Sequence, residues 1–158
     1  MRKHGPPETS RRWADTSGAD DVRGRILDHL MEVLHAFRRV LLEVVDEHEL
    51  TPMHLFALRA LEEPTPMGAL AELLHCDRSH ITGVADELEG RGAVERQAHP
   101  SDRRVKLLAL TPEGAELRDR LEAELLSRSP VAQGLSAEEQ EQLSDLLARA
   151  GGPIAGDA

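Results

Sequence analysis

An acid and two arginines stand together in the stretch PSDRRVKLLALTPEG, which runs from Pro100 to Gly114. Apolar residues alternate on both sides of Asp102, Arg103 and Arg104, so the spacing predicts strands over 93–97 and 105–110 with the triplet at the tip of a hairpin. An exposed arginine at such a tip can enter a DNA minor groove, where negative potential is concentrated, and a neighbouring acid can orient it. The alternative is a solvated turn with a surface ion pair of about 0–1 kcal/mol.

A second polar group opens a predicted helix over 78–90, and it comprises Arg78, Ser79, His80 and Thr82. A shorter helix is predicted over 66–75, and only His75-Cys76-Asp77 separates the two. This is the pattern of a helix-turn-helix, whose second helix presents its N-terminal residues to the major groove. An ordinary solvated helix start has the same composition, and the helix pair alone leaves the two interpretations even. The hairpin that follows favours DNA, because a ribbon in this place is a wing, predicted over 97–105.

The composition fits a DNA-binding protein only once the charge is divided along the chain. The 158 residues are 40% hydrophobic and 2% aromatic, which predicts one globular chain with a helical Leu, Val and Ala core, and the net charge is -10. Residues 78–106 hold six basic and five acidic residues, a balance of +1 that leaves -11 for the rest. A locally basic face can therefore bind phosphate. One cysteine, no signal peptide and no bilayer-spanning apolar run predict a cytoplasmic protein without a membrane partner.

The remaining elements are predicted to be helices. Apolar residues recur every three or four positions from Val22 to Val45, and further helices are predicted over 52–62, 112–128 and 137–149. Three Thr-Pro dipeptides, at Thr51, Thr65 and Thr111, should each cap a helix start, and Ser136 opens a capping box. The predicted fold is mainly α with a small β-hairpin wing. We divide it into a flexible arm (1–19), a long helix (20–50), a winged helix-turn-helix lobe (51–110), C-terminal helices (111–150) and a frayed tail (151–158).

Two narrow leucine stripes lie in the C-terminal helices. They consist of Leu117, Leu121 and Leu125, and of Leu143, Leu146 and Leu147. Such thin stripes either pack against a partner's first helix or complete the core of their own chain. The residues alone favour packing within the chain.

The wing and the helix pair together resemble the MarR family of bacterial regulators. The resemblance rests on Asp102-Arg103-Arg104 followed by a strand ending in Leu110-Thr111 and by Gly114. The stretch from Asp77 to Gly83 is similar to the start of that family's recognition helix, and Leu88 to Gly92 is similar to its end. The order of elements matches over about residues 21–150.

This resemblance implies a homodimeric winged-helix repressor of transcription that binds palindromic DNA operators. It also implies that residues 20–50 form a dimerisation helix and residues 111–150 the C-terminal dimerisation helices. Arg104 would be the minor-groove arginine and Asp102 its orienting partner. The other expected DNA contacts are Thr65, Arg78, Ser79, His80, Thr82 and Arg103. Relatives often bind aromatic acids in a cleft between the dimer helices and the DNA lobe. A small-molecule effector is therefore an expected partner, and the cleft candidates are Trp13, His48, His54 and Arg59.

Other functions stay open as alternatives. Cys76 precedes a helix N-terminus, where a thiol can become reactive, so one alternative is a redox-sensing regulator; its other interpretation is a small buried hydrophobe. A further alternative is a helical protein-interaction module. We predict neither a cofactor nor a metal site, since His29 and His35 lie on different helical faces and converging ligands are missing. The sequence lacks a Gly-rich phosphate loop and hydrolase motifs, so no enzyme is expected.

Overall fold

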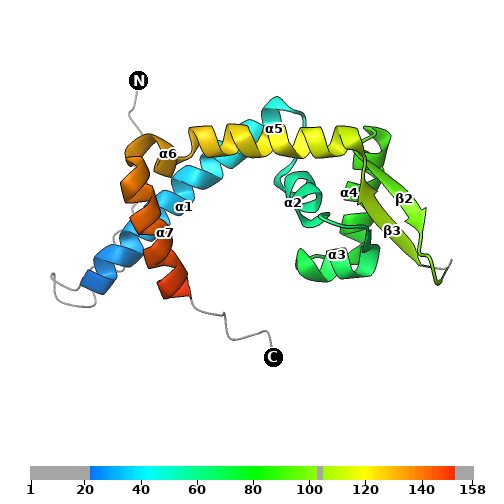
Figure 1. The fold of residues 1–158 in the computed structure, drawn as a ribbon, viewed down its shortest axis with the longest axis horizontal. Coiled ribbons are helices and arrows are strands. Elements are labelled where there is room, and N and C mark those ends of the chain that lie inside the picture. The colour runs from blue at the N-terminus through cyan, green and yellow to red at the C-terminus, as the bar shows by residue number, and fades with distance from the viewer. Residues whose placement is uncertain (1–21, 103–104, 152–158) are drawn as a thin grey trace, which may run out of the picture. The chain divides into compact units, whose positions relative to one another are not determined.

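The computed structural model describes residues 22–102 and 105–151, and Figure 1 shows the order of their helices and strands. The elements are α1 (Val22–Glu47), α2 (Pro52–Ala60), β1 (Thr65–Pro66), α3 (Met67–Leu73), α4 (Arg78–Gly90), β2 (Val94–Ala98), β3 (Lys106–Leu110), α5 (Pro112–Arg128), α6 (Pro130–Gly134) and α7 (Ala137–Gly151). The mainly helical fold with a small sheet is therefore confirmed. The predicted arm (1–19) and most of the tail (151–158) lie outside the described residues.

Two of the three Thr-Pro dipeptides cap helices as predicted. The Thr51 hydroxyl accepts from the His54 backbone N–H, and the Thr111 hydroxyl accepts from the Gly114 N–H at 3.0 Å. Ser136 and Glu139 form the predicted capping box, in which Glu139 also accepts from the Ser136 backbone N–H at 2.8 Å. These bonds satisfy amides that have no partner inside the helix, which fixes where α2, α5 and α7 begin.

The third dipeptide behaves differently, and the predicted cap at Thr65 is wrong. Thr65 donates its hydroxyl to the Glu63 carbonyl at 2.8 Å, and Pro66 stands at the N-cap of α3 without a side-chain bond. Both residues form β1, in which Thr65 pairs with Leu108 and Pro66 with Leu107. Pairing with a strand some forty residues away decides this segment, and local propensity does not reveal it.

Three helices end by the same backbone device. In α1, α3 and α4 the chain turns through a residue with positive φ: Glu49 (55°), His75 (50°) and Gly92 (73°). The next amide then bonds back to the last turn, as in Leu50 N to Val45 O at 2.8 Å and Ala93 N to Leu88 O at 2.9 Å. This is the Schellman motif, and only the end of α4 uses the glycine that suits it. Because this turn at His75 reverses the chain within a few residues, α4 can begin at Arg78, soon after α3 ends at Leu73.

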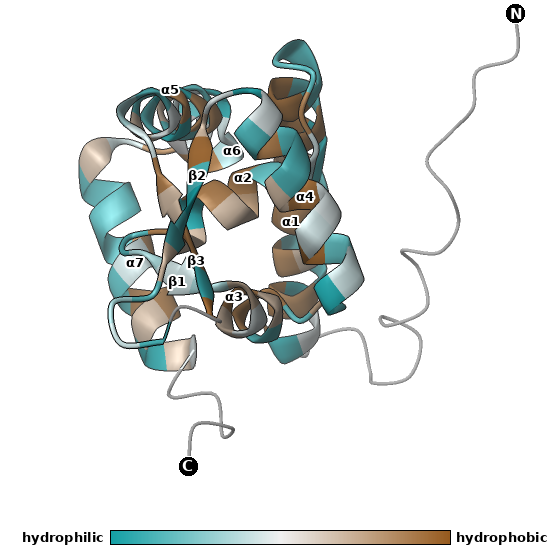
Figure 2. Cartoon of the chain, turned by 90° about the vertical axis from the view of Figure 1, so that its right-hand side faces the viewer, coloured by the Kyte–Doolittle hydropathy of each residue, from teal (hydrophilic) through white to brown (hydrophobic). Residues whose placement is uncertain are grey.

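The sheet has three antiparallel strands in the order β1-β3-β2, whereas the sequence predicted only the β2–β3 hairpin. Val94 pairs with Leu110 and Ala98 with Lys106, so the register of the hairpin spans both strands. Leu107, Leu108 and Ala109 of β3 are buried, while β2 is mostly exposed and hydrophilic (Figure 2). Strand β3 therefore packs against the core, whereas β2 is exposed to solvent.

The core of this part of the chain is built from aliphatic side chains on helices α1 to α5, on strands β2 and β3, and at Leu61 just after α2. Its largest fully buried members are Leu55, Leu58, Leu61, Leu70, Ile81, Leu88, Leu108, Leu121, Val44, Val45 and Val94. Leu121 and Leu125 of α5 are thus buried in the single chain, and α5 contacts α2. This corrects the expectation that their stripe is left for a partner: the alternative of packing within the chain is right for these two residues.

Two other segments leave their apolar residues uncovered in the single chain. The contacts set residues up to Arg39 apart from the rest, and in that part of α1 Ile26, Leu30 and Leu34 are 51%, 45% and 55% exposed. Helix α7 has no buried residue, and Leu146 and Leu147 are exposed. In the described part of the chain no helix is long and apolar enough to cross a membrane.

Candidate nucleic-acid interface

The first turn of α4 presents a polar surface next to α3. Arg78, Ser79 and His80 are all exposed, whereas Ile81 is fully buried and fixes the face that packs inward. The Arg78 guanidinium lies against Gly68 of α3, where an added Cβ would stand 3.0 Å from Nη2. Glycine at position 68 therefore lets a long basic side chain cross the helix pair.

Thr82 also belongs to the exposed face of α4, but its hydroxyl proton is already used. It donates to the Arg78 backbone carbonyl at 2.7 Å, one helical turn back. The oxygen keeps its lone pairs and the side chain keeps its methyl group. Thr82 can thus accept from a base amino group or contact a thymine methyl, whereas Ser79 can both donate and accept.

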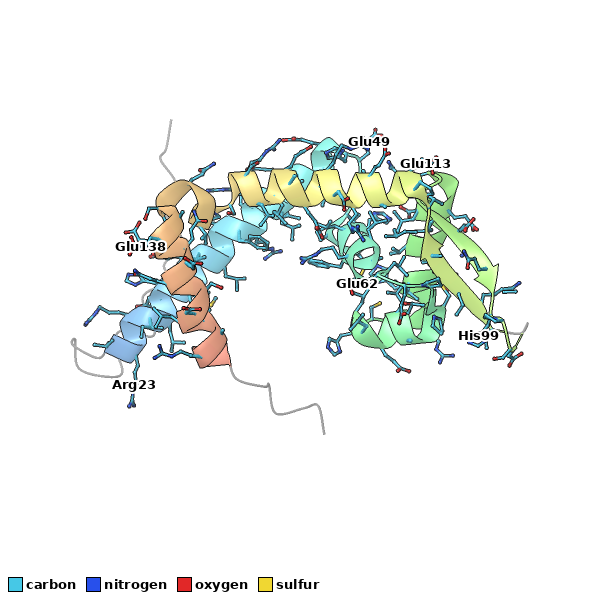
Figure 3. All side chains as sticks on the ribbon, viewed as in Figure 1. Arg23, Glu49, Glu62, His99, Glu113 and Glu138 are labelled. Atoms are coloured by element: carbon cyan, nitrogen blue, oxygen red, sulfur yellow. The ribbon has the colours of Figure 1, made fainter. Side chains whose placement is uncertain are left out.

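Local hydrogen bonds hold the described part of the wing, up to Asp102 on one side and from Val105 on the other. His99 is labelled in Figure 3 at the far end of the hairpin. Its ring Nδ1 accepts from the Ser101 backbone N–H at 3.2 Å, and its backbone N–H donates to the Val105 carbonyl. The Asp102 carbonyl accepts from the Val105 N–H at 3.0 Å, which closes the turn. Arg103 and Arg104 lie outside the described residues. The structure thus brings the backbone of Asp102 to the hairpin tip, as the sequence predicted.

The base of the wing is joined to the start of α5 by a close backbone contact. The Thr111 N–H donates to Ala93 O at 3.1 Å and its hydroxyl donates to Gly92 O at 2.6 Å. Gly114 lies so near that an added Cβ would stand 1.8 Å from Ala93 O. The spacing from Thr111 to Gly114 is therefore a docking requirement: threonine binds the turn, and glycine lets the helix approach it.

Arg96 is a residue of the interface that sequence reasoning missed. Its guanidinium, which projects from β2, forms hydrogen-bonded ion pairs with Asp86 and Glu89 of α4. The hydrogen bond that Arg96 donates to Asp86 and the negative charge of Glu89 raise the pKa of Arg96. An available signal was the spacing of Asp86 and Glu89, three residues apart on one helical face.

His54, predicted in a ligand cleft, is instead a buried structural residue. Its Nδ1 accepts from the Thr51 backbone N–H at 3.0 Å, so the neutral ring carries its proton on Nε2. Nε2 lies 3.1 Å from Glu87 Oε2, close enough for an ion pair but out of line for a hydrogen bond. Burial lowers the pKa of His54, and the opposing attraction of Glu87 does not reverse the shift.

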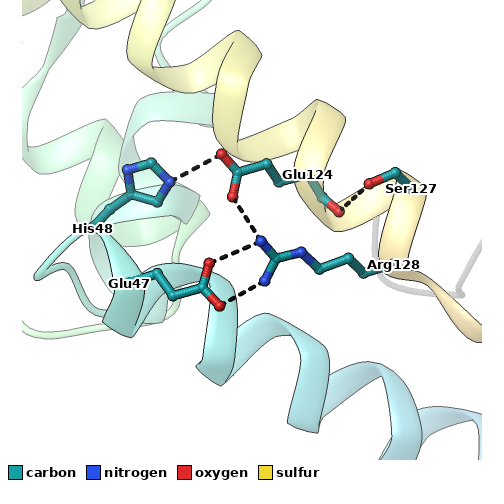
Figure 4. Close-up of polar contacts among 5 residues, drawn as sticks. All are labelled: Glu47, His48, Glu124, Ser127 and Arg128. Carbon is teal, nitrogen blue, oxygen red and sulfur yellow. Dashed lines mark hydrogen bonds and ion pairs between the residues drawn. The ribbon is translucent and has the colours of Figure 1, made fainter.

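The two other described cleft candidates, His48 and Arg59, are each paired with an acidic residue of α5. His48 Nε2 lies 3.2 Å from Glu124 Oε1, beside a bidentate pair between Arg128 and Glu47 (Figure 4). Arg59 Nε lies 3.0 Å from Glu122 Oε1. These contacts join the end of α1 and the side of α2 to α5. Trp13 lies outside the described residues.

The structure separates the cleft candidates rather than joining them. Arg59 lines an open hollow of about 660 Å³ with five other residues, Ala60, Glu62, Glu63, Thr65 and Leu73. His54 is enclosed at the N-terminal end of α2, and His48 is half-buried against Glu124. Arg59 shares its hollow with Thr65, another residue that the sequence predicts to be functional.

Cys76 sits half-buried in the turn between α3 and α4. Its backbone N–H donates to Ala71 O at 3.0 Å, and its side chain borders a shallow hollow of about 590 Å³ with Glu72, His75, Asp77 and Arg78. Among the described residues no three His, Cys, Asp or Glu side chains form a group that could hold a metal ion. Cys76 thus shares this hollow with Arg78 at the start of α4.

A helix-turn-helix followed by an antiparallel ribbon, with the exposed polar start of its second helix, defines the winged-helix class of DNA-binding proteins. The sequence model of the MarR family matches residues 50–106, which hold both the helix pair and the wing. The chain belongs to the MarR family, whose members are regulators of transcription and not enzymes.

Solved structures of similar proteins cover most of the chain. A probable transcriptional regulator from Pseudomonas aeruginosa is 30% identical over 82% of this chain and 99% of its own, with a TM-score of 0.62. A MarR family regulator from Rhodococcus sp. RHA1 is 27% identical over 85% and 97%, with a TM-score of 0.65. CouR from Rhodococcus jostii RHA1, solved with p-coumaroyl-CoA, is 29% identical over 88% and 97%, with a TM-score of 0.58.

Proposed function

We propose that the chain is a homodimeric repressor that binds palindromic operators, with α4 in the major groove and residues 97–105 in the minor groove. The observation that carries this proposal is the exposed first turn of α4, in which Arg78, Ser79 and His80 stand beside a wing tethered to the same helix. Arg104 at the wing tip is assigned the minor-groove contact and Asp102 its orientation. Arg103 and Thr65 are assigned to the phosphate backbone.

The dimer part of the proposal rests on apolar residues that the single chain leaves uncovered. Ile26, Leu30 and Leu34 in the first part of α1, and Leu146 and Leu147 of α7, would be covered by a second copy. Burial of such residues gives roughly 25 cal/mol per Å² of apolar surface. A two-fold dimer also explains a palindrome, because each copy would read one half-site.

Binding should weaken as the salt concentration rises. The chain carries a net charge of -10, so phosphate contacts must come from a few local bases such as Arg78 and Arg104. Each neutralised phosphate releases about 0.9 of a counterion, and the free energy that this release contributes to binding falls as the salt concentration rises. The acidic remainder of the chain repels DNA that is not correctly placed. Specific and non-specific binding should therefore separate clearly at moderate ionic strength.

The test begins with DNA selected from the genome of the source organism and measures affinity by fluorescence anisotropy. We expect a palindromic sequence to bind at least a hundredfold more tightly than a scrambled one at matched salt. Arg104→Ala should weaken binding by about 1–3 kcal/mol on all sequences, whereas Ser79→Ala or His80→Ala should also change the selected consensus. Equal affinity for selected and scrambled DNA would overturn the proposal.

Release by a small effector is the regulatory part of the proposal. It is supported by CouR, which was solved with p-coumaroyl-CoA, and by the hollow beside Arg59 in this chain. The test adds aromatic carboxylic acids and aromatic acyl-CoA thioesters to the protein–operator complex. A ligand that releases DNA from the wild type and acts more weakly on Arg59→Gln supports the site. Release that is equal in both proteins contradicts the assignment of Arg59.

A further inference from the structure

The wing is tied to the recognition helix through one side chain. Arg96 stands in the middle of β2 and is 28% exposed, and its two terminal nitrogens contact Asp86 and Glu89 of α4. These acids lie one helical turn apart on the same face, so the planar guanidinium spans both of them. The next two residues of the strand, Gln97 and Ala98, are exposed.

The inner end of the β2–β3 ribbon is fixed in the core. Val94 is buried and pairs with Leu110, which holds the ribbon where it leaves the core. Arg96 pairs with Leu108, and that partner is fully buried in β3. The strand β1 pairs with β3 only at Leu107 and Leu108, so the ribbon is two-stranded from the pair of Ala98 and Lys106 outward. A two-stranded ribbon twists and bends more easily than a wider sheet, so a side-chain tether at Arg96, just before this part begins, restricts the angle of the tip.

That angle matters for DNA binding, because α4 and the wing tip must reach two grooves at once. A ribbon that swings freely would lose this freedom on binding and would weaken the complex. We propose that Arg96 is a positioning residue: its pairs with Asp86 and Glu89 hold the wing at the angle at which residues 97–105 meet the minor groove while α4 occupies the major groove. This inference rests on the DNA-binding mode proposed above.

If Arg96 acted on DNA only through its charge, one double variant would bind DNA more tightly, whereas the positioning role predicts weaker binding. Asp86→Asn with Glu89→Gln removes two negative charges near DNA and frees a positive one, so charge alone predicts tighter binding. Loss of positioning predicts weaker binding with a detached wing. Both substituted residues are exposed, so the double variant should keep its fold. Circular dichroism and thermal unfolding check this before DNA is added.

The experiment compares dimethyl sulfate protection of guanine N7, in the major groove, with that of adenine N3, in the minor groove. We expect Arg96→Gln and the double variant to keep major-groove protection, to lose minor-groove protection and to bind about tenfold more weakly. Arg96→Lys should keep only part of the minor-groove protection and of the affinity, because a lysine cannot span two carboxylates. Arg118→Gln, which removes a pair with the adjacent Asp119, is the matched control and should behave as the wild type.

The outcomes separate this inference from the proposal beneath it. A wild type that protects neither groove contradicts the proposed binding mode itself. A wild type that protects both grooves, combined with a double variant that binds more tightly and still protects adenine N3, overturns the positioning role alone.

Discussion

Arg91 Nη2 donates a 2.6 Å hydrogen bond to the backbone carbonyl of Glu49, and so joins the end of α4 to the end of α1. Its Nη1 donates to the carbonyl of His48 at 3.3 Å. Both carbonyls lie in the turn that directly follows α1, at the end where a helix leaves acceptors unsatisfied. A guanidinium from another helix thus supplies the donors and the positive charge that this end favours.

Loss of this contact should destabilise the protein without changing the side chains proposed to bind DNA. We expect Arg91→Ala to lower the free energy of unfolding by about 1 kcal/mol, the ordinary value for a hydrogen bond that solvent partly screens. Urea denaturation measures it. Arg118→Ala is the control, since its exposed pair with Asp119 should be worth under about 0.5 kcal/mol. Equal losses in the two variants would show that Arg91 is not a tether.

Gly114→Ala should be among the most damaging small substitutions in the chain. Its methyl group would stand 1.8 Å from Ala93 O, and the obstacle is backbone, which cannot rotate away. We expect a loss of about 3 kcal/mol, at the upper end of overpacking effects. Gly83→Ala is the matched control: it also lies in a helix, with nothing near the added Cβ, and should stabilise by about 0.5–1 kcal/mol. A neutral Gly114→Ala would contradict the docking of α5.

Stability should fall on mild acidification because of His54. Burial holds the folded pKa of His54 below its ordinary value of 6.5, so the unfolded chain binds the proton first as pH falls. The contribution of His54 is therefore full above about pH 6.5 and is lost as pH falls toward the folded pKa. His54→Gln can still accept from Thr51 N–H in a capping box and cannot titrate. Urea midpoints at pH 7.5 and 5.5 should differ less in this variant than in the wild type; an equal difference would exclude His54.

Two leucine variants should distinguish dimerisation from folding. Leu30→Glu puts a charge on the uncovered part of α1, so we expect folded monomers by size-exclusion chromatography with light scattering. Leu121→Glu buries an unpaired carboxylate in the core of one chain and should unfold it, at a cost of several kcal/mol. Leu73→Glu, on an exposed position of α3, is the control and should remain dimeric. A monomeric wild type would contradict the dimer.

Local signals predicted most of the fold. The boundaries of α4 at 78–90 and of α5 at 112–128 agree with the sequence, because Thr111 and the Gly92 turn act within a few residues of the ends that they set. The misses depend on distant partners. Thr65 enters a strand because it meets Leu108, and Leu121 is covered because α2 packs on α5. The five-residue α6 carried no periodic signal.

The candidate site also has residues that local patterns predict and residues whose contacts depend on distant partners. The exposed start of α4 and the turn at Asp102 follow from local patterns, and the structure places both as expected. His48 and His54 were grouped by residue type, but each has its own acidic partner, Glu124 and Glu87, far away in the sequence. Arg96 was missed for the same reason, since a basic residue in a strand does not show which helix face it meets.

The most direct measurement of the central claim is a methylation-protection footprint of the wild-type protein on its selected operator. We predict guanine N7 protection in two major-groove segments about one helical turn apart, roughly 10 base pairs, each flanked by adenine N3 protection in the minor groove. That pattern requires α4 and the wing to act together in a dimer. Protection confined to one groove, or a single unpaired segment, would contradict the account.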